Sequence, residues 1–206
     1  MDKKISIGIE RRISLYVLEL ALRSVLDGSA SADYFYELAY TECTGANRAK
    51  KMVGVINRMT LNSKLTPFLK EHQEEVLQAL RSKSDRNLLF VAMMCSSYSI
   101  FYDTVSAFGK YFHVQDQIGR EFLLKKLAEK YGSNRALDVA YDCIVPMLIE
   151  AGFIVRPKPG IYEICKQDKY SAFAKKVYLQ SFLLNNTSLI GSDEVESNPY
   201  FEFLHH

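Results

Sequence analysis

The chain has 206 residues, of which 48% are hydrophobic and 24% charged, and its formal net charge is +2. These are the proportions of an ordinary globular domain, and ten glycines and five prolines exclude a fibrous or low-complexity chain. The apolar uncharged run at residues 88–102 is shorter than the roughly 20 apolar residues of a membrane-spanning helix. Because the first residues also lack a secretory signal, we expect a cytoplasmic protein with no membrane partner.

Helical periodicity dominates the beginning of the chain. Apolar residues recur at three- and four-residue steps over residues 10–26, and Gly28 ends this predicted helix because glycine tolerates a left-handed backbone. Ser31 is placed to cap a second helix, and Gly45 separates that helix from a third over residues 47–62. The sequence therefore predicts three successive helices in this part of the chain.

Two further helices are predicted in the first half of the chain. Thr66 and the proline that follows it are typical of a helix start, with the hydroxyl as cap, and predict a helix over residues 66–80. Ser84 or Asp85 caps a long fifth helix that contains the uncharged run and continues towards Phe112. The aromatic residues of this long helix have the spacing of a packed core rather than of a base-stacking surface.

Two helices and a hairpin follow. Residues 116–131 form an amphipathic pattern, and Ser133 can cap the next helix, which ends at Gly152. Pro146 lies within that helix and is expected to kink it, because proline removes a backbone donor. After Gly152, two β-rich segments flank the turn Arg-Pro-Lys-Pro-Gly at residues 156–160, which is the composition of a β-hairpin.

The predicted fold is mainly α: a helical bundle with a C-terminal winged-helix-like unit that contains one short β-hairpin. We expect a helical domain over residues 1–113 and the winged-helix-like unit with a last helix over residues 114–190. Residues 191–206 contain four acidic residues and no lysine or arginine, so a mobile acidic tail is expected there.

The winged-helix-like unit is the first feature that could carry a function. In such DNA-binding modules the second helix lies in the major groove, and Arg156 and Lys158 at the hairpin tip would contact phosphates. Winged helices also serve as protein-interaction modules, and carboxylates on the outward stripe of the second helix would weaken DNA binding. That stripe would consist of Arg135, Asp138, Asp142 and Ile149.

The third predicted helix is the second such feature. The segment from residue 45 to residue 70 contains six basic residues and no acidic one, and Arg48, Lys51 and Arg58 fall on one helix face. Such a stripe is typical of nucleic-acid binding, although it could also be a solvated face or bind an acidic protein segment, including this chain's own tail. We expect the basic residues of separate segments to converge on one surface. The predicted DNA-contacting residues are Arg48, Lys50, Lys51, Arg58, Lys64, Arg135, Arg156 and Lys158.

No motif in the sequence indicates an enzyme. There is no phosphate-binding loop or dinucleotide-binding motif, the histidines have no metal-ligand spacing, and the four distant cysteines are expected to be reduced thiols. We therefore predict a non-enzymatic protein with no cofactor and no metal. Asp103 and Asp116, as paired carboxylates for acid–base catalysis, are the remaining alternative.

The layout resembles that of the BrxA family, accessory proteins of the bacterial BREX phage-defence systems. The likeness covers about residues 5–165 and is carried by Ile-Asn-Arg-Met at residues 56–59, the aromatic segment 98–103, and residues 148–154. The resemblance implies an all-helical, non-enzymatic protein with winged-helix character that binds double-stranded DNA beside a methyltransferase and other defence-system proteins. The alternative is a protein-interaction scaffold that docks onto a larger defence enzyme.

Overall fold

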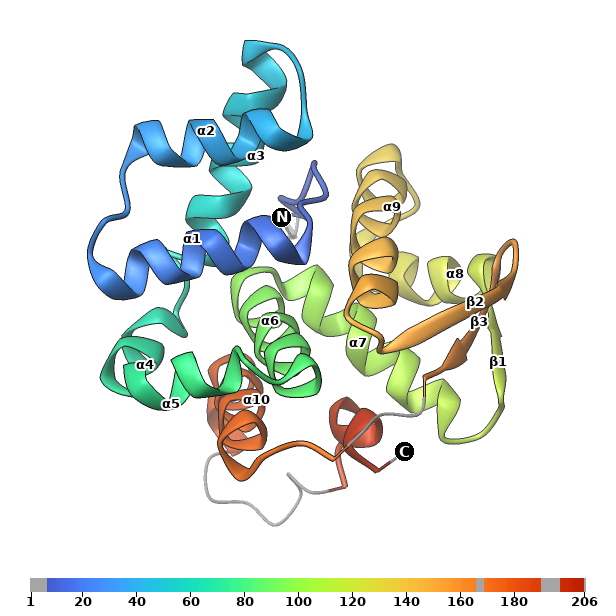
Figure 1. Cartoon of the computed structure of the whole chain (residues 1–206). Coiled ribbons are helices and arrows are strands. Elements are labelled where there is room, and N and C mark those ends of the chain that lie inside the picture. Colours follow the sequence, from blue (N-terminus) through green and yellow to red (C-terminus); the bar gives the residue numbers. More distant parts are fainter. Residues whose placement is uncertain (1–6, 166–168, 190–196, 206) are drawn as a thin grey trace.

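The computed structural model describes residues 7–165, 169–189 and 197–205. These residues form a mainly helical protein with one three-stranded antiparallel sheet. In Figure 1 the helices α6 and α7 run through the middle, with α1–α5 on one side and α8, α9 and the strands on the other. The mainly α fold predicted from the sequence is confirmed at this level.

The first three helices are α1 (Leu15–Asp27), α2 (Ala32–Glu42) and α3 (Ala46–Met59). The side chains of Ser14 and Ser31 cap α1 and α2 by accepting backbone N–H groups of the first turn. Gly28 ends α1 in a left-handed conformation with φ 81°, as predicted. The predicted start of the first helix at residue 10 was wrong, because the cap is Ser14 and residues 7–13 are not helical.

The predicted helix over residues 66–80 is divided at His72. It consists of α4 (Thr66–Glu71) and α5 (Gln73–Ala79). The His72 ring stacks on Phe68 with centroids 4.3 Å apart, and its Nδ1 lies 3.0 Å from the Phe68 carbonyl oxygen. Thr66 was wrongly predicted as a side-chain cap, because its hydroxyl donates to the Thr60 carbonyl instead.

The long fifth helix is likewise divided, into α6 (Lys83–Ser97) and α7 (Ser99–Phe112). Tyr98 is extended at the break, and the carbonyl of Ser97 accepts from Nε of Arg58 at 3.0 Å. The predicted cap of this helix was also wrong, because Ser82 precedes α6 and Asp85 lies in its first turn. The Asp85 carboxylate accepts the Ser171 N–H at 2.8 Å, at the start of α10 (Ala172–Asn185).

The next part of the chain has the order β1 (Gln117–Gly119), α8 (Arg120–Tyr131), α9 (Arg135–Glu150), β2 (Ile154–Lys158) and β3 (Ile161–Ile164). The sheet order is β1-β3-β2, and both pairings are antiparallel.

Two details of this region differ from the prediction. The predicted hairpin is confirmed, but β1 replaces the start of the helix expected from residue 116, because Ile118 is buried opposite Tyr162. Asn134, not Ser133, caps α9 by accepting the N–H groups of Ala136 and Leu137, and α9 continues through Pro146.

The end of the described chain belongs to the core. After η1 (Thr187–Leu189), the 3₁₀ helix η3 (Pro199–Leu204) buries Tyr200 and Phe203. A Cβ added at Gly109 of α7 would lie 1.9 Å from the Pro199 carbonyl oxygen, so η3 lies directly against the α7 backbone. The prediction of a mobile acidic tail was wrong for residues 197–205, and residues 191–196 lie outside the described residues.

The core is continuous across the predicted domain boundary. Buried apolar side chains form a single cluster that extends from Ile9 to Phe203, with residues 88–95 of α6 fully enclosed. The predicted division at residue 113 therefore does not separate two hydrophobic cores. Within the described ranges, every helix is too short or too polar to cross a bilayer.

Candidate nucleic-acid interface

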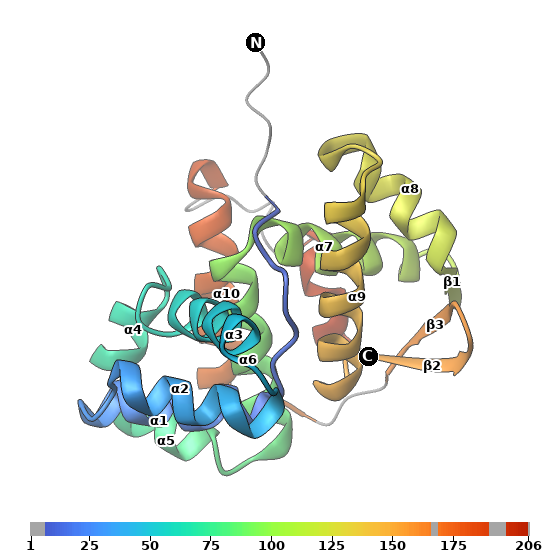
Figure 2. The same cartoon turned by 90° about the horizontal axis from the view of Figure 1, so that it is seen from above.

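The N-terminal segment, residues 7–13, passes in extended form between α3 and α9 (Figure 2). Ile9 and Ile13 alternate with exposed or partly exposed residues, and both are buried in the core. Glu10 and Arg12 are exposed, whereas Arg11, on the same side of the segment as Ile9 and Ile13, is partly buried. The segment is therefore fixed in place between α3 and α9 and forms part of the surface there.

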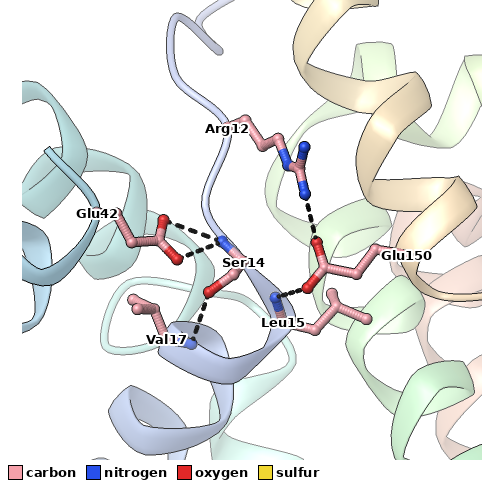
Figure 3. A network of polar contacts seen from close by, with 6 residues as sticks. All are labelled: Arg12, Ser14, Leu15, Val17, Glu42 and Glu150. Carbon is pink, nitrogen blue, oxygen red and sulfur yellow. Dashed lines mark hydrogen bonds and ion pairs between the residues drawn. The ribbon is translucent and has the colours of Figure 1, made fainter.

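A polar network holds the end of this segment in place (Figure 3). Both carboxylate oxygens of Glu42 accept the N–H of Ser14 at 3.1 Å. The carboxylate of Glu150 accepts the N–H of Leu15 at 2.8 Å and a guanidinium N–H of Arg12 at 2.9 Å. Two carboxylates at the positive end of the α1 dipole are favourably placed, and they join α1 to α2 and α9.

A groove of about 890 Å³ lies between α3 and α9. Three cations from three separate parts of the chain line it: Arg11 of the N-terminal segment, Lys51 of α3, and Arg135 in the first turn of α9. Glu10 is the one carboxylate among the described residues that line this α3–α9 groove. The groove therefore carries a net positive charge and can hold an anion.

Glu10 forms an ion pair with Lys51 inside the groove. The Nζ of Lys51 lies 2.5 Å from Oε2 of Glu10, and the two side chains are 55% and 60% exposed. The hydrogen bond and the charge of Lys51 hold the pKa of the Glu10 carboxyl below its usual value. Exposed pairs of this kind contribute little stability. The Glu10 carboxylate occupies a position on Lys51 that a phosphate oxygen could take.

A smaller hollow of about 530 Å³ lies at the C-terminal end of α2, and Arg11 lines both this hollow and the groove. The Nε of Arg11 is buried and has no hydrogen-bond partner among the described residues. We call this second site the Arg48 hollow. The residues that line it are Arg11, Arg12, Tyr40, Thr41, Glu42, Cys43, Thr44, Arg48 and Met52.

The remaining predicted residues of the basic helix region are less closely associated with the groove. Arg58 lies beside Gly8, but its guanidinium carbon stacks 4.4 Å from the centre of the Tyr98 ring, and its Nε binds Ser97. Arg58 thus supports the break between α6 and α7. Lys50 and Lys64 are exposed, Lys50 on α3 and Lys64 in the turn that follows it, and neither lines the groove.

The hairpin residues lie elsewhere. Arg156 and Lys158 are exposed on β2, and in both views α9 stands between α3 and the hairpin. Between these regions, Asp142 on the outward face of α9 forms an ion pair with Arg120 at 2.8 Å. The structure therefore brings Lys51 and Arg135 together, with Arg48 in the adjoining hollow, but does not bring the hairpin cations into the same groove.

Arg11 is the residue that sequence reasoning missed. It lies in a segment that was assigned to a helix, and no periodicity marks its role. The doublet Arg11-Arg12, close in sequence to a basic helix, is the signal that could have drawn attention to it.

No catalytic arrangement is apparent among the described residues. Asp103, one of the two carboxylates considered for acid–base work, accepts from the Tyr131 hydroxyl and forms an ion pair with Lys130 at 2.6 Å. Burial and the neighbouring carboxylate raise the pKa of Tyr131 well above its usual value. No group of three or more potential metal ligands occurs in the part of the chain that the structure describes.

Comparison with known proteins adds no relative: no family, no curated protein and no solved structure matches the chain. The functional argument therefore depends on the geometry of the groove and the hollow.

Proposed function

We propose that this protein binds DNA through backbone phosphates at the α3–α9 groove. The observation that carries the proposal is the meeting of Arg11, Lys51 and Arg135, from three separate segments, around a groove with one carboxylate. Lysine and arginine that contact phosphates supply affinity and position the protein without reading the sequence. The exposed guanidinium of Arg48 in the adjoining hollow extends the same charged surface.

The topology of the C-terminal unit supports a winged-helix assignment within this proposal. The order α7, β1, α8, α9, β2 and β3, with the sheet order β1-β3-β2, is that of a winged helix. Asp138 and Asp142 are exposed on α9, and carboxylates on a helix in the major groove would weaken binding. We therefore propose that the start of α9 contacts DNA phosphates and does not read base edges. Arg156 and Lys158 would add further phosphate contacts.

The resemblance to the BrxA family supports a biological role for the proposed DNA binding. In that role the protein is a non-enzymatic accessory of a phage-defence system and works beside a DNA methyltransferase. Genes for a methyltransferase and a large ATPase next to this gene would support the assignment, and their absence would count against it.

The test is a titration of duplex DNA at several salt concentrations. Four phosphate contacts, from Arg11, Arg48, Lys51 and Arg135, predict a slope of log affinity against log salt of about −3.6. Affinity should then fall about 150-fold between roughly 50 and 200 mM salt. The double variant Lys51→Gln, Arg135→Gln should reduce the slope to about −1.8.

The matched control removes the same charge outside the groove. Lys70 and Lys125 are exposed and do not line it, so Lys70→Gln, Lys125→Gln should leave the slope near that of the natural chain. Equal losses in the two double variants would contradict a localised site. If neither variant alters DNA affinity but the groove variant loses a protein partner in a pull-down, the scaffold alternative is favoured.

A further inference from the structure

Tyr40 is an aromatic side chain exposed within the Arg48 hollow. It lies near the end of α2 and is 51% exposed, although most aromatic residues of this chain are buried. Its ring centre lies 6.4 Å from that of Tyr36, one turn earlier on the same helix. Tyr36 therefore supports the Tyr40 ring, and much of Tyr40 remains open to the solvent.

Three arginines line the same hollow as this ring, and they differ in the contacts that their guanidinium groups form. Arg12 is bound to Glu150, whereas the Arg48 guanidinium forms no hydrogen bond or ion pair with the described residues, and Arg11 has a buried Nε without a partner among them. Among the described residues that line the hollow, Glu42 is the one carboxylate, and both of its oxygens accept the N–H of Ser14. Arg11 and Arg48 are therefore the cations that can bind an anion beside Tyr40.

We propose that the Arg48 hollow binds an unpaired nucleotide at a DNA end or in a single-stranded stretch. The base stacks on Tyr40, and the adjoining phosphate lies between Arg11 and Arg48. Aromatic rings beside cationic side chains form the usual binding surface for single strands, and each stacked base contributes about 1–3 kcal/mol. A base within a duplex is stacked on both faces and cannot reach Tyr40, so the hollow selects unpaired nucleotides.

The hollow and the groove form one path. Because Arg11 lines both, a strand whose duplex part lies against Lys51 and Arg135 can place its unpaired end beside Tyr40. This inference rests on the proposed DNA binding at the groove and adds a preference for duplexes with single-stranded ends.

The test compares a blunt duplex with the same duplex carrying a short single-stranded overhang, by fluorescence anisotropy at fixed salt. The natural chain should bind the overhang duplex about 5- to 150-fold more tightly, which is the stacking contribution of one base. Tyr40→Ala should abolish this gain and leave blunt-duplex binding unchanged, whereas Tyr40→Phe should keep it. A 2-aminopurine base in the overhang should lose fluorescence on binding to the natural chain and to Tyr40→Phe, but not to Tyr40→Ala.

The control variant is Tyr16→Ala. Tyr16 of α1 is 66% exposed and does not line the hollow, so this substitution should keep the overhang gain. The inference is overturned if blunt and overhang duplexes bind the natural chain equally, or if Tyr40→Ala keeps the gain. Binding of the blunt duplex with no overhang gain leaves the proposed function standing, whereas a failure to bind either duplex overturns both.

Discussion

The backbone N–H of Leu15 donates to Oε1 of Glu150 at 2.8 Å, although the two residues are 135 positions apart in the sequence. The other carboxylate oxygen of Glu150 binds Arg12 at 2.9 Å. Glu150 is the last residue of α9, and Leu15 is the first of α1. One carboxylate therefore accepts the first N–H of α1 and ties Arg12, which lines the Arg48 hollow, to the C-terminal end of α9.

Glu150→Ala should lower the free energy of unfolding by about 1–2 kcal/mol. The substitution leaves the Leu15 N–H without its acceptor and removes a negative charge from the positive end of α1, two losses comparable with the removal of a helix cap. Glu150→Gln should cost less, because an amide oxygen can still accept the N–H. Urea unfolding monitored by circular dichroism measures both variants.

The control for this prediction is Glu129→Ala. The Glu129 side chain is 62% exposed and pairs with Lys126 at 2.8 Å, and removal of such an exposed pair should leave the free energy of unfolding nearly unchanged. Equal free energies of unfolding for Glu150→Ala and Glu129→Ala would show that the contact between Glu150 and α1 does not stabilise the protein.

Gly109→Ala should destabilise the protein, although alanine favours helices. The new Cβ would lie 1.9 Å from the backbone carbonyl oxygen of Pro199, so η3 must move away from α7. We expect a cost of about 1–3 kcal/mol, as for other overpacked sites, together with faster proteolysis near the C-terminus. Thermal unfolding and limited proteolysis measure the two effects.

Gly54→Ala is the matched helical control for Gly109→Ala. A Cβ at Gly54 of α3 meets nothing within 4 Å, so this substitution should stabilise the protein by about 0.5–1 kcal/mol. If Gly109→Ala stabilises the protein as much as Gly54→Ala does, η3 does not pack closely on α7.

Local chemistry explains which parts of the fold could be predicted. The cap at Ser31, the helix end at Gly28 and the hairpin each depend on a few adjacent residues, and the sequence indicates all three. The break at Tyr98 depends on Arg58, which lies 39 positions before the Ser97 carbonyl that it binds. Periodicity within a helix contains no information about such a distant donor.

The C-terminal residues were predicted wrongly for a different reason. Their acidic composition suggested mobility, but Tyr200 and Phe203 are buried and outweigh the charges. Asn198 before a proline is a helix-start signal, and its side chain does accept the N–H of Tyr200. Greater weight on these aromatic residues would have corrected the prediction.

The candidate site was predictable in part. Helical spacing placed Arg48 and Lys51 on a common face, and Lys51 lines the groove while Arg48 lines the adjoining hollow. The spacing could not show that the Arg58 guanidinium stacks on the Tyr98 ring. It also could not show that Arg11, which lies outside any helix, completes the charged surface. Both facts depend on the path of the N-terminal segment between α3 and α9.

Thiol labelling should separate the cysteines by burial. Burial raises the pKa of the Cys143 thiol to about 11, so at pH 8 only about one molecule in a thousand carries the reactive thiolate there. Cys95 is also fully buried, whereas Cys43 and Cys165 are partly exposed. Iodoacetamide should therefore modify Cys43 and Cys165 first, as followed by peptide mass spectrometry, and all four in guanidinium chloride. Labelling of Cys143 as fast as Cys43 would show that α9 opens around Cys143.

Glu10→Gln should strengthen DNA binding about two- to fivefold at low salt. The substitution removes the carboxylate that pairs with Lys51 at 2.5 Å, so a phosphate no longer competes with it and meets no negative charge in the groove. Because Lys51 lowers the pKa of Glu10, the carboxylate is ionised throughout the neutral range, and only the substitution removes its charge there. The gain should shrink as salt screens the groove, whereas Glu129→Gln, an equal change of charge outside the groove, should produce none. Equal affinities of the natural chain and Glu10→Gln at low salt would show that phosphates do not approach Lys51.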